Sequence, residues 1–516
     1  MDNRDTDAAW TYHDATKHSY QSLRADSHAL DWANAPLPFK VYSTLEPIAL
    51  PHDLPPAKMP ALAAIAASGT DPAGTRLPDL RTLAGILFFS AGITRRRAGA
   101  GGEVLYRAAA CTGALYHIEL YLVCGKLPDL PAGVYHFGVH DFVLRKLRAG
   151  DHRGAVLKAS GGEPSIAAAP AIIVCTGTYW RNAWKYEARA YRHCFWDTGT
   201  ILANLLAAAA AYDLPAKIVS GFVDAEVNRL LDLDADHEVA LILVAIGQDQ
   251  TSPPAAIPDF GPLALPTAPL SKREVDYPAI RAMHAASSLT GEDEVRAWRA
   301  EAPAAECPSP SGRLIELAPH GDAELPSDSV TQVVLRRGSS RRFARQPITL
   351  AQLSTMLGRA TRGVPADFLA PTGRTLNRLY LIVHAVEGLR AGPYVFHRDT
   401  RVLELLKEGN FRRKAGYLAL EQALAADASV NVYLLADLAR ALERFGNRGY
   451  RAAQLEAGII GGKLYLAAYA QRLGATGLTF YDDDVTAFFS PHATGRSVMF
   501  LAALGRPVTR TAQGGE

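Results

Sequence analysis

Eight residues in the second half of the chain combine arginine and serine in a pattern suited to binding an anion. Residues 336–343 read RRGSSRRF and hold four arginines and two serines. Guanidinium groups match the oxygens of a phosphate with paired hydrogen bonds, and hydroxyl and backbone N–H groups supply further donors. The apolar spacing of residues 349–361 places this segment just ahead of a helix. A phosphate site is one interpretation, and a solvated basic turn is the other.

A lysine followed by a tyrosine is the second candidate for chemistry. Lys185 and Tyr186 lie in RNAWKYEARAYR, within a long predicted helix over residues 176–214. Both side chains ordinarily titrate near pH ~10, but burial or neighbouring cations can lower the pKa of a lysine into the range of a general base. The alternative is an ordinary solvated lysine beside a tyrosine of the core.

The elements that must position these residues occur twice, because the second half of the chain repeats the first at a spacing close to 259 residues. The matched segments are 133–147 with 392–406, 190–214 with 449–473, 220–227 with 479–485, and 244–247 with 502–505. Such regular spacing predicts two homologous α+β domains in one chain. We expect them to pack about a pseudo-twofold axis, as the subunits of a symmetric dimer do.

Apolar patterning predicts the elements of the first repeat. Strands are expected over residues 115–123, 133–137, 170–175 and 240–246, and helices over 59–67, 80–92 and 176–214. Residues 93–107, which contain RRRAGAGGEVLYR, are expected to form a glycine- and arginine-rich loop.

Proline-rich stretches set the predicted domain boundaries. Residues 1–50 are expected to form an arm across the body, 51–251 the first domain and 326–516 the second. Residues 252–325 contain PPAAIPDFGPLALPTAPL and EAPAAECPSPSG, so we expect a linker that carries one helix over 292–300.

The two repeats differ at the candidate site. Alignment of the following helices places residues 336–343 opposite AASGTDPA at 66–73, which holds no arginine. The Lys-Tyr pair lies opposite Arg444 and Phe445, which removes both titratable groups. The sequence therefore predicts one composite site, with a phosphate anchor from the second domain and reactive side chains from the first.

Composition and charge restrict the class of protein. The chain has 516 residues, of which 48% are hydrophobic and 21% charged, as in a globular protein with a large core. Its net charge of +2 gives no general attraction for nucleic acid. The N-terminus lacks the apolar core of a signal peptide, and the apolar run 203–211 is shorter than the about 20 residues that span a bilayer. We expect a cytoplasmic protein that binds neither nucleic acid nor membrane.

Cysteine and histidine spacing shows no metal motif. The histidines, for example His13, His18 and His117, have no HExxH spacing, so no metal site is expected. The GAGG of residues 99–102 has no Walker lysine. Free thiols in a reducing compartment are expected for the five cysteines, Cys111, Cys124, Cys175, Cys194 and Cys307.

Over nearly its whole length, the chain resembles the tandem nitroreductase-fold dehydrogenases of the SagB/ThcOx type. The similar segments are YHDATKHSY…LDWANAPLPFKVY, RAAACTGALYHIELYLV, RGSSRRF and WKYEARAYRH. RGSSRRF resembles the Arg-x-Ser-x-Arg-x-Phe signature with which nitroreductase-fold proteins hold flavin mononucleotide (FMN). WKYEARAYRH resembles the Lys-Tyr motif of the azoline oxidases.

This resemblance implies one FMN between two copies of an α+β domain. Lys185 and Tyr186 would be the catalytic residues on the substrate side. Ala110-Cys111 replaces the family's Pro-Ser pair in the first copy, so a hydroxyl contact there would come from the next residue. By position, the FMN-binding residues would be Arg337, Ser339, Arg341, Thr112, Gly113, Gly477 and Arg506.

Three functions are compatible with these residues. The first is an FMN-dependent dehydrogenase that desaturates a C–N or C–C bond, such as that of an azoline ring, in a modified peptide or another biosynthetic intermediate. The second is an NAD(P)H-dependent nitro- or quinone reductase on the same fold. The third is a non-catalytic scaffold for partner enzymes in a biosynthetic complex. Further association into a homodimer is compatible with each.

Overall fold

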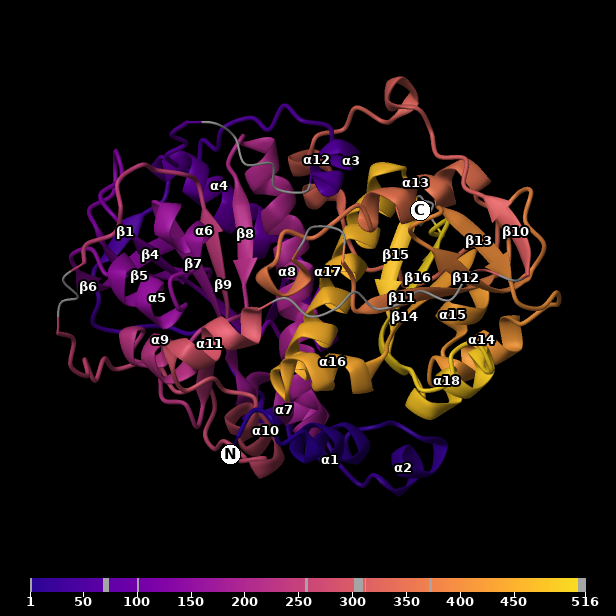
Figure 1. Ribbon diagram of the computed structural model, residues 1–516, viewed down its shortest axis with the longest axis horizontal. Coiled ribbons are helices and arrows are strands. Elements are labelled where there is room, and N and C mark those ends of the chain that lie inside the picture. Colours follow the sequence, from indigo (N-terminus) through magenta and orange to yellow (C-terminus); the bar gives the residue numbers. More distant parts are fainter. Residues whose placement is uncertain are drawn as a thin grey trace, which may run out of the picture.

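The computed structural model describes residues 2–67, 74–99, 102–255, 259–300, 310, 312–370 and 374–508. The two halves of the chain lie side by side, each built around its own sheet (Figure 1). Two long helices, α8 (Ala190–Ala211) and α17 (Arg448–Ala470), pack against each other between the halves.

Both halves contain a seven-stranded antiparallel sheet with the same connectivity. The first has the order β1-β6-β5-β4-β7-β9-β8 and the second β10-β13-β12-β11-β14-β16-β15, so the strands correspond one to one. The strands of the first sheet are β1 (Pro47–Ala49), β4 (Ile118–Cys124), β5 (Gly133–Gly138), β6 (Val143–Ala149), β7 (Ala171–Thr178), β8 (Ala216–Val219) and β9 (Glu238–Ile246). Those of the second are β10 (Arg313–Glu316), β11 (Asn377–Val383), β12 (Gly392–His397), β13 (Val402–Leu405), β14 (Val430–Ala436), β15 (Gly474–Gly477) and β16 (Ser497–Gly505). The prediction of two tandem α+β domains is confirmed.

Helices cover the sheets, and central strands such as β4 and β7 are buried at every residue because both of their faces are covered. The remaining helices of the first half are α3 (Ala61–Ala66), α4 (Leu80–Ala91), α5 (Arg153–Ala159), α6 (Pro164–Ala168), α7 (Tyr179–Tyr186) and α9 (Asp224–Leu230). Those of the second are α12 (Val330–Arg336), α13 (Leu350–Ala360), α14 (Arg412–Leu418), α15 (Ala423–Asp427), α16 (Leu438–Phe445) and α18 (Asp482–Phe489).

Helices α8 and α17 meet at equivalent glycines. A Cβ atom added to Gly199 would lie 2.5 Å from the carbonyl carbon of Gly458, and one added to Gly458 would lie 2.6 Å from the carbonyl oxygen of Trp196. No side chain fits at either position. Because the two glycines are equivalent in the repeat, their contact marks the pseudo-twofold axis that the sequence predicted.

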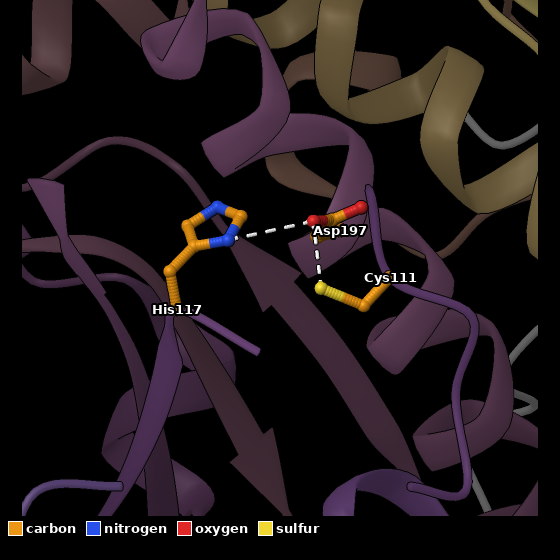
Figure 2. A group of neighbouring side chains, drawn as sticks. All are labelled: Cys111, His117 and Asp197. Atoms are coloured by element: carbon orange, nitrogen blue, oxygen red, sulfur yellow. Dashed lines mark hydrogen bonds and ion pairs between the residues drawn. The ribbon is translucent and has the colours of Figure 1, made fainter. Parts of the chain in front are cut away.

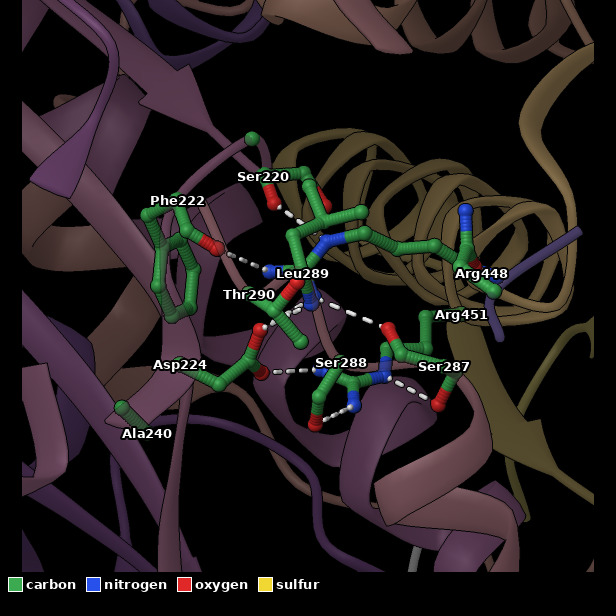
Figure 3. A network of polar contacts seen from close by, with 12 residues as sticks. Ser220, Phe222, Asp224, Ala240, Ser287, Ser288, Leu289, Thr290, Arg448 and Arg451 are labelled. Carbon is green, nitrogen blue, oxygen red and sulfur yellow. Dashed lines mark hydrogen bonds and ion pairs between the residues drawn. The ribbon is translucent and has the colours of Figure 1, made fainter. Parts of the chain in front are cut away.

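A buried polar network joins the two halves (Figure 3). The carboxylate of Asp224, in α9, accepts hydrogen bonds from Nη1 of Arg448 at 2.6 Å and from Nη1 of Arg451 at 2.7 Å. Further N–H groups of the two arginines donate to the Ser220 carbonyl and the Ser287 hydroxyl. Burial raises the pKa of Asp224, but the two guanidinium groups outweigh it and hold the pKa at about 2.

The opposite contact repeats this arrangement. Asp482, at the start of α18, pairs with Nη1 of Arg192 at 2.6 Å and with Nη1 of Arg189 at 3.0 Å. These two arginines of the first half correspond to Arg451 and Arg448 of the second. The halves therefore exchange equivalent ion pairs, as an isologous dimer does.

The N-terminal arm contacts both halves, and it contains α1 (Asp7–Ala15) and α2 (Tyr20–Ala25), which lie below the body in Figure 1. The side-chain amide of Asn3 donates to the Phe445 carbonyl at 3.0 Å. Further along, the Trp184 indole of α7 donates to the carbonyl of Asp31 at 3.1 Å. The arm is thus tied to the ends of the equivalent helices α7 and α16.

The segment between the halves contains more structure than a linker. Residues 252–325 include α10 (Pro278–Ala286), α11 (Glu292–Arg299) and strand β10. Strand β10 pairs with β13 in the second sheet, as β1 of the arm pairs with β6 in the first. The predicted domain boundaries stay a prediction, but each sheet takes its edge strand from the segment that precedes its domain.

Residues 93–99 and 102–107 form the two paired strands of a β-hairpin, so the prediction of a loop is wrong. Strand β2 (Ile93–Gly99) pairs antiparallel with β3 (Gly102–Arg107). Gly99 and Gly102 form the last pair of the two strands, and arginines occupy positions where an apolar residue would signal a strand.

The stretch from Tyr179 to Ala211 is long and apolar enough to cross a membrane, but 89% of its most apolar window is buried inside the protein. Its apolar surface therefore serves the core. The four described cysteines, Cys111, Cys124, Cys175 and Cys194, are free thiols as expected, and Cys307 lies outside the described residues.

Candidate functional site

One carboxylate of the central helix holds the loop that leads into β4. Asp197 of α8 accepts hydrogen bonds from the backbone N–H and the hydroxyl of Thr112, each at 2.9 Å. The Cys111 thiol donates to the same carboxylate at 3.1 Å, and Nδ1 of His117 lies 3.5 Å from it (Figure 2). These contacts fix the loop, and the half-buried Thr112 and exposed Gly113 lie at its turn.

Burial controls the protonation of this cluster. It raises the pKa of Asp197 to about 7, although the donors of Cys111 and Thr112 act in the opposite direction. It raises the pKa of the Cys111 thiol and lowers that of His117 to about 3. Near neutral pH the thiol and the imidazole are therefore uncharged, and Asp197 is the group that titrates.

The Lys-Tyr pair lies against this loop, at the end of α7. A Cβ atom added to Gly113 would lie 2.8 Å from the Tyr186 hydroxyl oxygen, so the glycine allows the tyrosine to approach. Nζ of Lys185 lies 5.3 Å from the centre of the Tyr186 ring. Burial raises the pKa of Tyr186, and nearby Asp197 adds to the rise, so its phenol stays protonated and can donate a hydrogen bond.

The turn after Tyr186 breaks the long helix that the sequence predicted. Glu187 has φ 48° and ψ −140°, a conformation unusual for a residue with a side chain. The equivalent residue in the second repeat is Gly446, with φ 64°. The first repeat therefore holds a strained turn directly after its candidate catalytic residues.

The arginine- and serine-rich segment after α12 presents unpaired donors. Its Ser340 N–H donates to the carbonyl of Ala475 in β15 at 2.9 Å, which fixes the segment beside the second sheet. Within the described part of the chain, the N–H groups of Gly338, Ser339 and Arg341 have no protein acceptor. The Ser340 hydroxyl is also unpaired, although this residue is only 7% exposed. The two successive unpaired N–H groups of Gly338 and Ser339, with that of Arg341 close by in the chain, are suited to an anion.

Arg337 joins this segment to the first domain. Its Nε donates to the carbonyl of Ala108 at 2.8 Å and its Nη2 to that of Arg107 at 2.9 Å. These acceptors lie just ahead of the Thr112 loop, so the two predicted halves of the site meet here. Burial lowers the pKa of Arg337. Together with an Nη1 contact to the Gly338 carbonyl at 3.3 Å, three of its N–H groups are engaged by the backbone and are not free for a ligand.

Tyr465 of α17 links the segment to Gly477. Its hydroxyl lies 3.3 Å from that of Ser339 and accepts a hydrogen bond from the Gly477 N–H. Arg341 is exposed and forms no ion pair with the described residues. Arg506 follows β16, and its Nε donates to the carbonyl of Pro347 at 2.9 Å. Among the described residues, neither Arg341 nor Arg506 forms a hydrogen bond or ion pair with another predicted site residue.

The equivalent position in the second repeat has the same scaffold without the Lys-Tyr pair. Glu456 replaces Asp197 and accepts hydrogen bonds from the N–H groups of Leu376 and Asn377. Arg444 and Phe445 end the equivalent helix. Residues 66–67 are described, but 68–73, opposite the anchor, and 371–373 lie outside the described residues. The loss of the second anchor stays a prediction.

Two residues of the site were missed because they lie within apolar helices. Asp197 aligns with Glu456, so comparison of the repeats would have found an acid retained in both copies. Tyr465 aligns with Leu206. The copy that carries the arginine- and serine-rich segment 336–343 is therefore also the copy that carries this tyrosine.

Comparisons with known proteins match both halves of the chain. Residues 139–248 and 334–502 match the model of the nitroreductase family. A crystal structure of a putative nitroreductase from Anabaena variabilis superposes with a TM-score of 0.77 and 26% identity, and covers 97% of this chain and 99% of that chain.

Two curated relatives are similar over shorter stretches. A putative nitroreductase of Methanocaldococcus jannaschii is 26% identical over 159 residues, which is 30% of this chain and 80% of that protein. The microcin B17-processing protein McbC of Escherichia coli is 26% identical over 141 residues, which is 26% of this chain and about half (52%) of McbC.

Proposed function

The chain belongs to the nitroreductase family of oxidoreductases, and we propose that it is an FMN-dependent dehydrogenase of the SagB/ThcOx type. Its reaction would remove two hydrogens across a C–N or C–C bond of a biosynthetic intermediate, as in the oxidation of an azoline ring. Similarity to a microcin-processing protein supports a peptide-derived substrate and partner enzymes in a biosynthetic complex.

The residues present fit a flavin phosphate. The unpaired N–H groups at Gly338, Ser339 and Arg341 would hold the phosphate. Thr112 and Gly113 would line the ring from the first domain. FMN, when bound, supplies an acceptor for a hydride and thereby the redox chemistry.

The observation that carries the proposal is the contact of the Lys-Tyr pair with the Thr112 loop. Tyr186 approaches Gly113 directly, and Lys185 lies beside the tyrosine ring. A reductase needs only access to the flavin, whereas a dehydrogenase also needs a group that removes a proton. The second repeat has Arg444 and Phe445 here. An arginine stays protonated and cannot accept a proton, and a phenylalanine has no hydroxyl to donate a hydrogen bond.

The two side chains would divide the proton transfers. Nζ of Lys185 would take the proton from the carbon beside the C=N group, while the hydride leaves from the neighbouring position. The Tyr186 hydroxyl donates a hydrogen bond to the heteroatom, because its raised pKa keeps it protonated. The substrate is oxidised by two electrons, and the lysine then releases its proton to solvent.

The test is the turnover of an azoline-containing peptide by Lys185→Ala and Tyr186→Phe. Removal of a general base costs about 10²- to 10⁴-fold in rate. We expect such a loss for Lys185→Ala, measured under anaerobic conditions as bleaching of the flavin absorbance. Lys158→Ala, an exposed lysine of α5 in the same domain, is the matched control. Unchanged bleaching with Lys185→Ala would contradict the assigned base.

A second candidate is an NAD(P)H-dependent nitro- or quinone reductase. Similarity to the putative nitroreductases of M. jannaschii and A. variabilis favours it. In that case Lys185→Ala would leave the reduction of a quinone or nitro compound intact, and azoline peptides would not bleach the flavin in any variant.

A further inference from the structure

The first repeat carries a hairpin that has no counterpart among the described residues of the second. Strands β2 and β3 fill the interval between α4 and β4. The corresponding interval between α13 and β11 contains the short helix η5 (Asp367–Leu369), and its described residues, 361–370 and 374–376, form no strand. The hairpin therefore distinguishes one composite site from the other.

The hairpin extends from the first domain to the arginine- and serine-rich segment of the second. Arg337 binds the carbonyl groups at the base of β3. Arg95, on β2, brings its guanidinium to the adjoining residue: a Cβ atom added to Gly338 would lie 4.0 Å from its Nη2. The charge of Arg95 contributes, after burial, to the lowered pKa of Arg337, in agreement with this proximity.

Arg95 is positioned by an aromatic ring and has no acidic partner among the described residues. Its guanidinium carbon lies 4.6 Å from the centre of the Tyr106 ring, on the opposing strand. The next residue, Arg96, instead pairs with Glu103 at 2.9 Å. Successive side chains of a strand point to opposite faces. Arg95 therefore lies on the face of the hairpin that is directed to the arginine- and serine-rich segment, and Arg96 lies on the other face.

Two guanidinium groups, those of Arg95 and Arg337, therefore lie near each other without a carboxylate to neutralise them. Arg95 forms no ion pair within the described part of the chain, and Arg337 donates to backbone carbonyls. The nearby Asp328 is engaged by Arg336 and Arg472. Like charges held together are costly unless an anion is bound between them.

We propose that Arg95 is a phosphate ligand, contributed by the hairpin of the first domain to the flavin phosphate held by the second. This inference rests on the proposed function. Because two N–H groups of Arg337 are engaged by Arg107 and Ala108, Arg95 supplies a charge that the segment itself does not. The phosphate is thereby held from both domains, and the equivalent site in the other half has no such ligand among its described residues.

The test compares FMN with riboflavin, which differs only in lacking the phosphate. Dissociation constants are measured by quenching of flavin fluorescence on the full chain after removal of bound flavin. A lost charge-assisted hydrogen bond corresponds to about ten- to hundredfold in affinity. We expect Arg95→Ala to weaken FMN by such a factor and leave riboflavin unchanged, while Arg96→Ala changes neither.

Each other outcome is decisive. An equal loss of both flavins in Arg95→Ala would mean that the hairpin supports the fold and not the phosphate, and would overturn the proposal. No change for either flavin in Arg95→Ala would also overturn the proposal. If Arg95→Ala then raised the KM for NADPH but not the KM for NADH, the arginine would be assigned to the 2′-phosphate of the dinucleotide. Wild-type protein that binds neither flavin would refute the proposed function itself.

Discussion

Asp482→Asn tests how strongly the exchanged ion pairs hold the two domains together. The side chain keeps its shape but loses its charge, and it leaves Arg189 and Arg192 buried without a counter-ion. Removing one partner of a buried ion pair costs about 3–5 kcal/mol. The unfolding entropy is about 2.1 cal/mol/K per residue, or about 1 kcal/mol/K for a chain of this size, so the melting temperature should fall by about 3–5 °C.

The control is the neighbouring carboxylate on the same helix. Asp483 pairs with Lys17 at 2.9 Å, and its side chain is 79% exposed. An exposed ion pair contributes about 0–1 kcal/mol, so Asp483→Asn should shift the melting temperature by at most about 1 °C. Thermal unfolding followed by circular dichroism measures both. Equal shifts for the two variants would refute the claim that burial makes the Asp482 contact strong.

The remaining predictions concern pH, strain and the anchor. The pKa of Asp224 and of Asp482 is held at about 2, so each carboxylate stabilises the fold by about 2–3 kcal/mol above pH ~4, and this contribution is lost as the pH falls towards 2. Acid titration of the urea midpoint should show a loss in that window, and a flat midpoint there would contradict the pairing. Glu187→Gly should raise stability by about 1 kcal/mol in urea unfolding, because glycine accepts a positive φ; a destabilised variant would show that the Glu187 side chain matters more than the strain. Gly458→Val should destabilise the chain by about 3 kcal/mol or more, since even a Cβ atom would overlap the facing helix, and a soluble variant of unchanged stability would exclude the close crossing. Tyr465→Phe should weaken FMN about tenfold in fluorescence titration through loss of the hydroxyl that joins Ser339 and Gly477, and unchanged affinity would exclude that role.

The double α+β architecture was predictable because its evidence is repetitive. Apolar strands such as β4 and β9, and the paired central helices, recur at one spacing, so each repeat supports the interpretation of the other. The edge strands β1 and β10 were not predictable. They are three and four residues long and mostly exposed, and pairing with β6 and β13 defines them.

The burial of charged residues between the two halves could not be predicted from the sequence either. Arg189 and Arg448 carry no local sign of burial, because the carboxylates that neutralise them belong to the opposite half. The same non-local origin explains the hairpin: a run of arginines near glycines indicates a loop until the strand pairing is seen.

The sequence predicted which residues belong to the candidate site. The contacts between those residues could be seen only in the folded structure. Comparison of the repeats indicated the Lys-Tyr pair and the segment 336–343. The approach of Tyr186 to Gly113 and the hydrogen bond from Arg337 to the Ala108 carbonyl depend on packing between residues far apart in the chain. How FMN would sit among them stays a prediction.

The most direct test of the central claim is the number of flavins bound per chain. Purified protein is saturated with FMN, and released flavin is quantified for the wild type, for Ser339→Ala/Arg341→Ala, and for Arg345→Ala, an exposed arginine paired with Asp427 as control. A single composite site predicts about one FMN per chain in the wild type and the control, and its loss in the double variant. Two FMN per chain, or none in the presence of excess FMN, would contradict it.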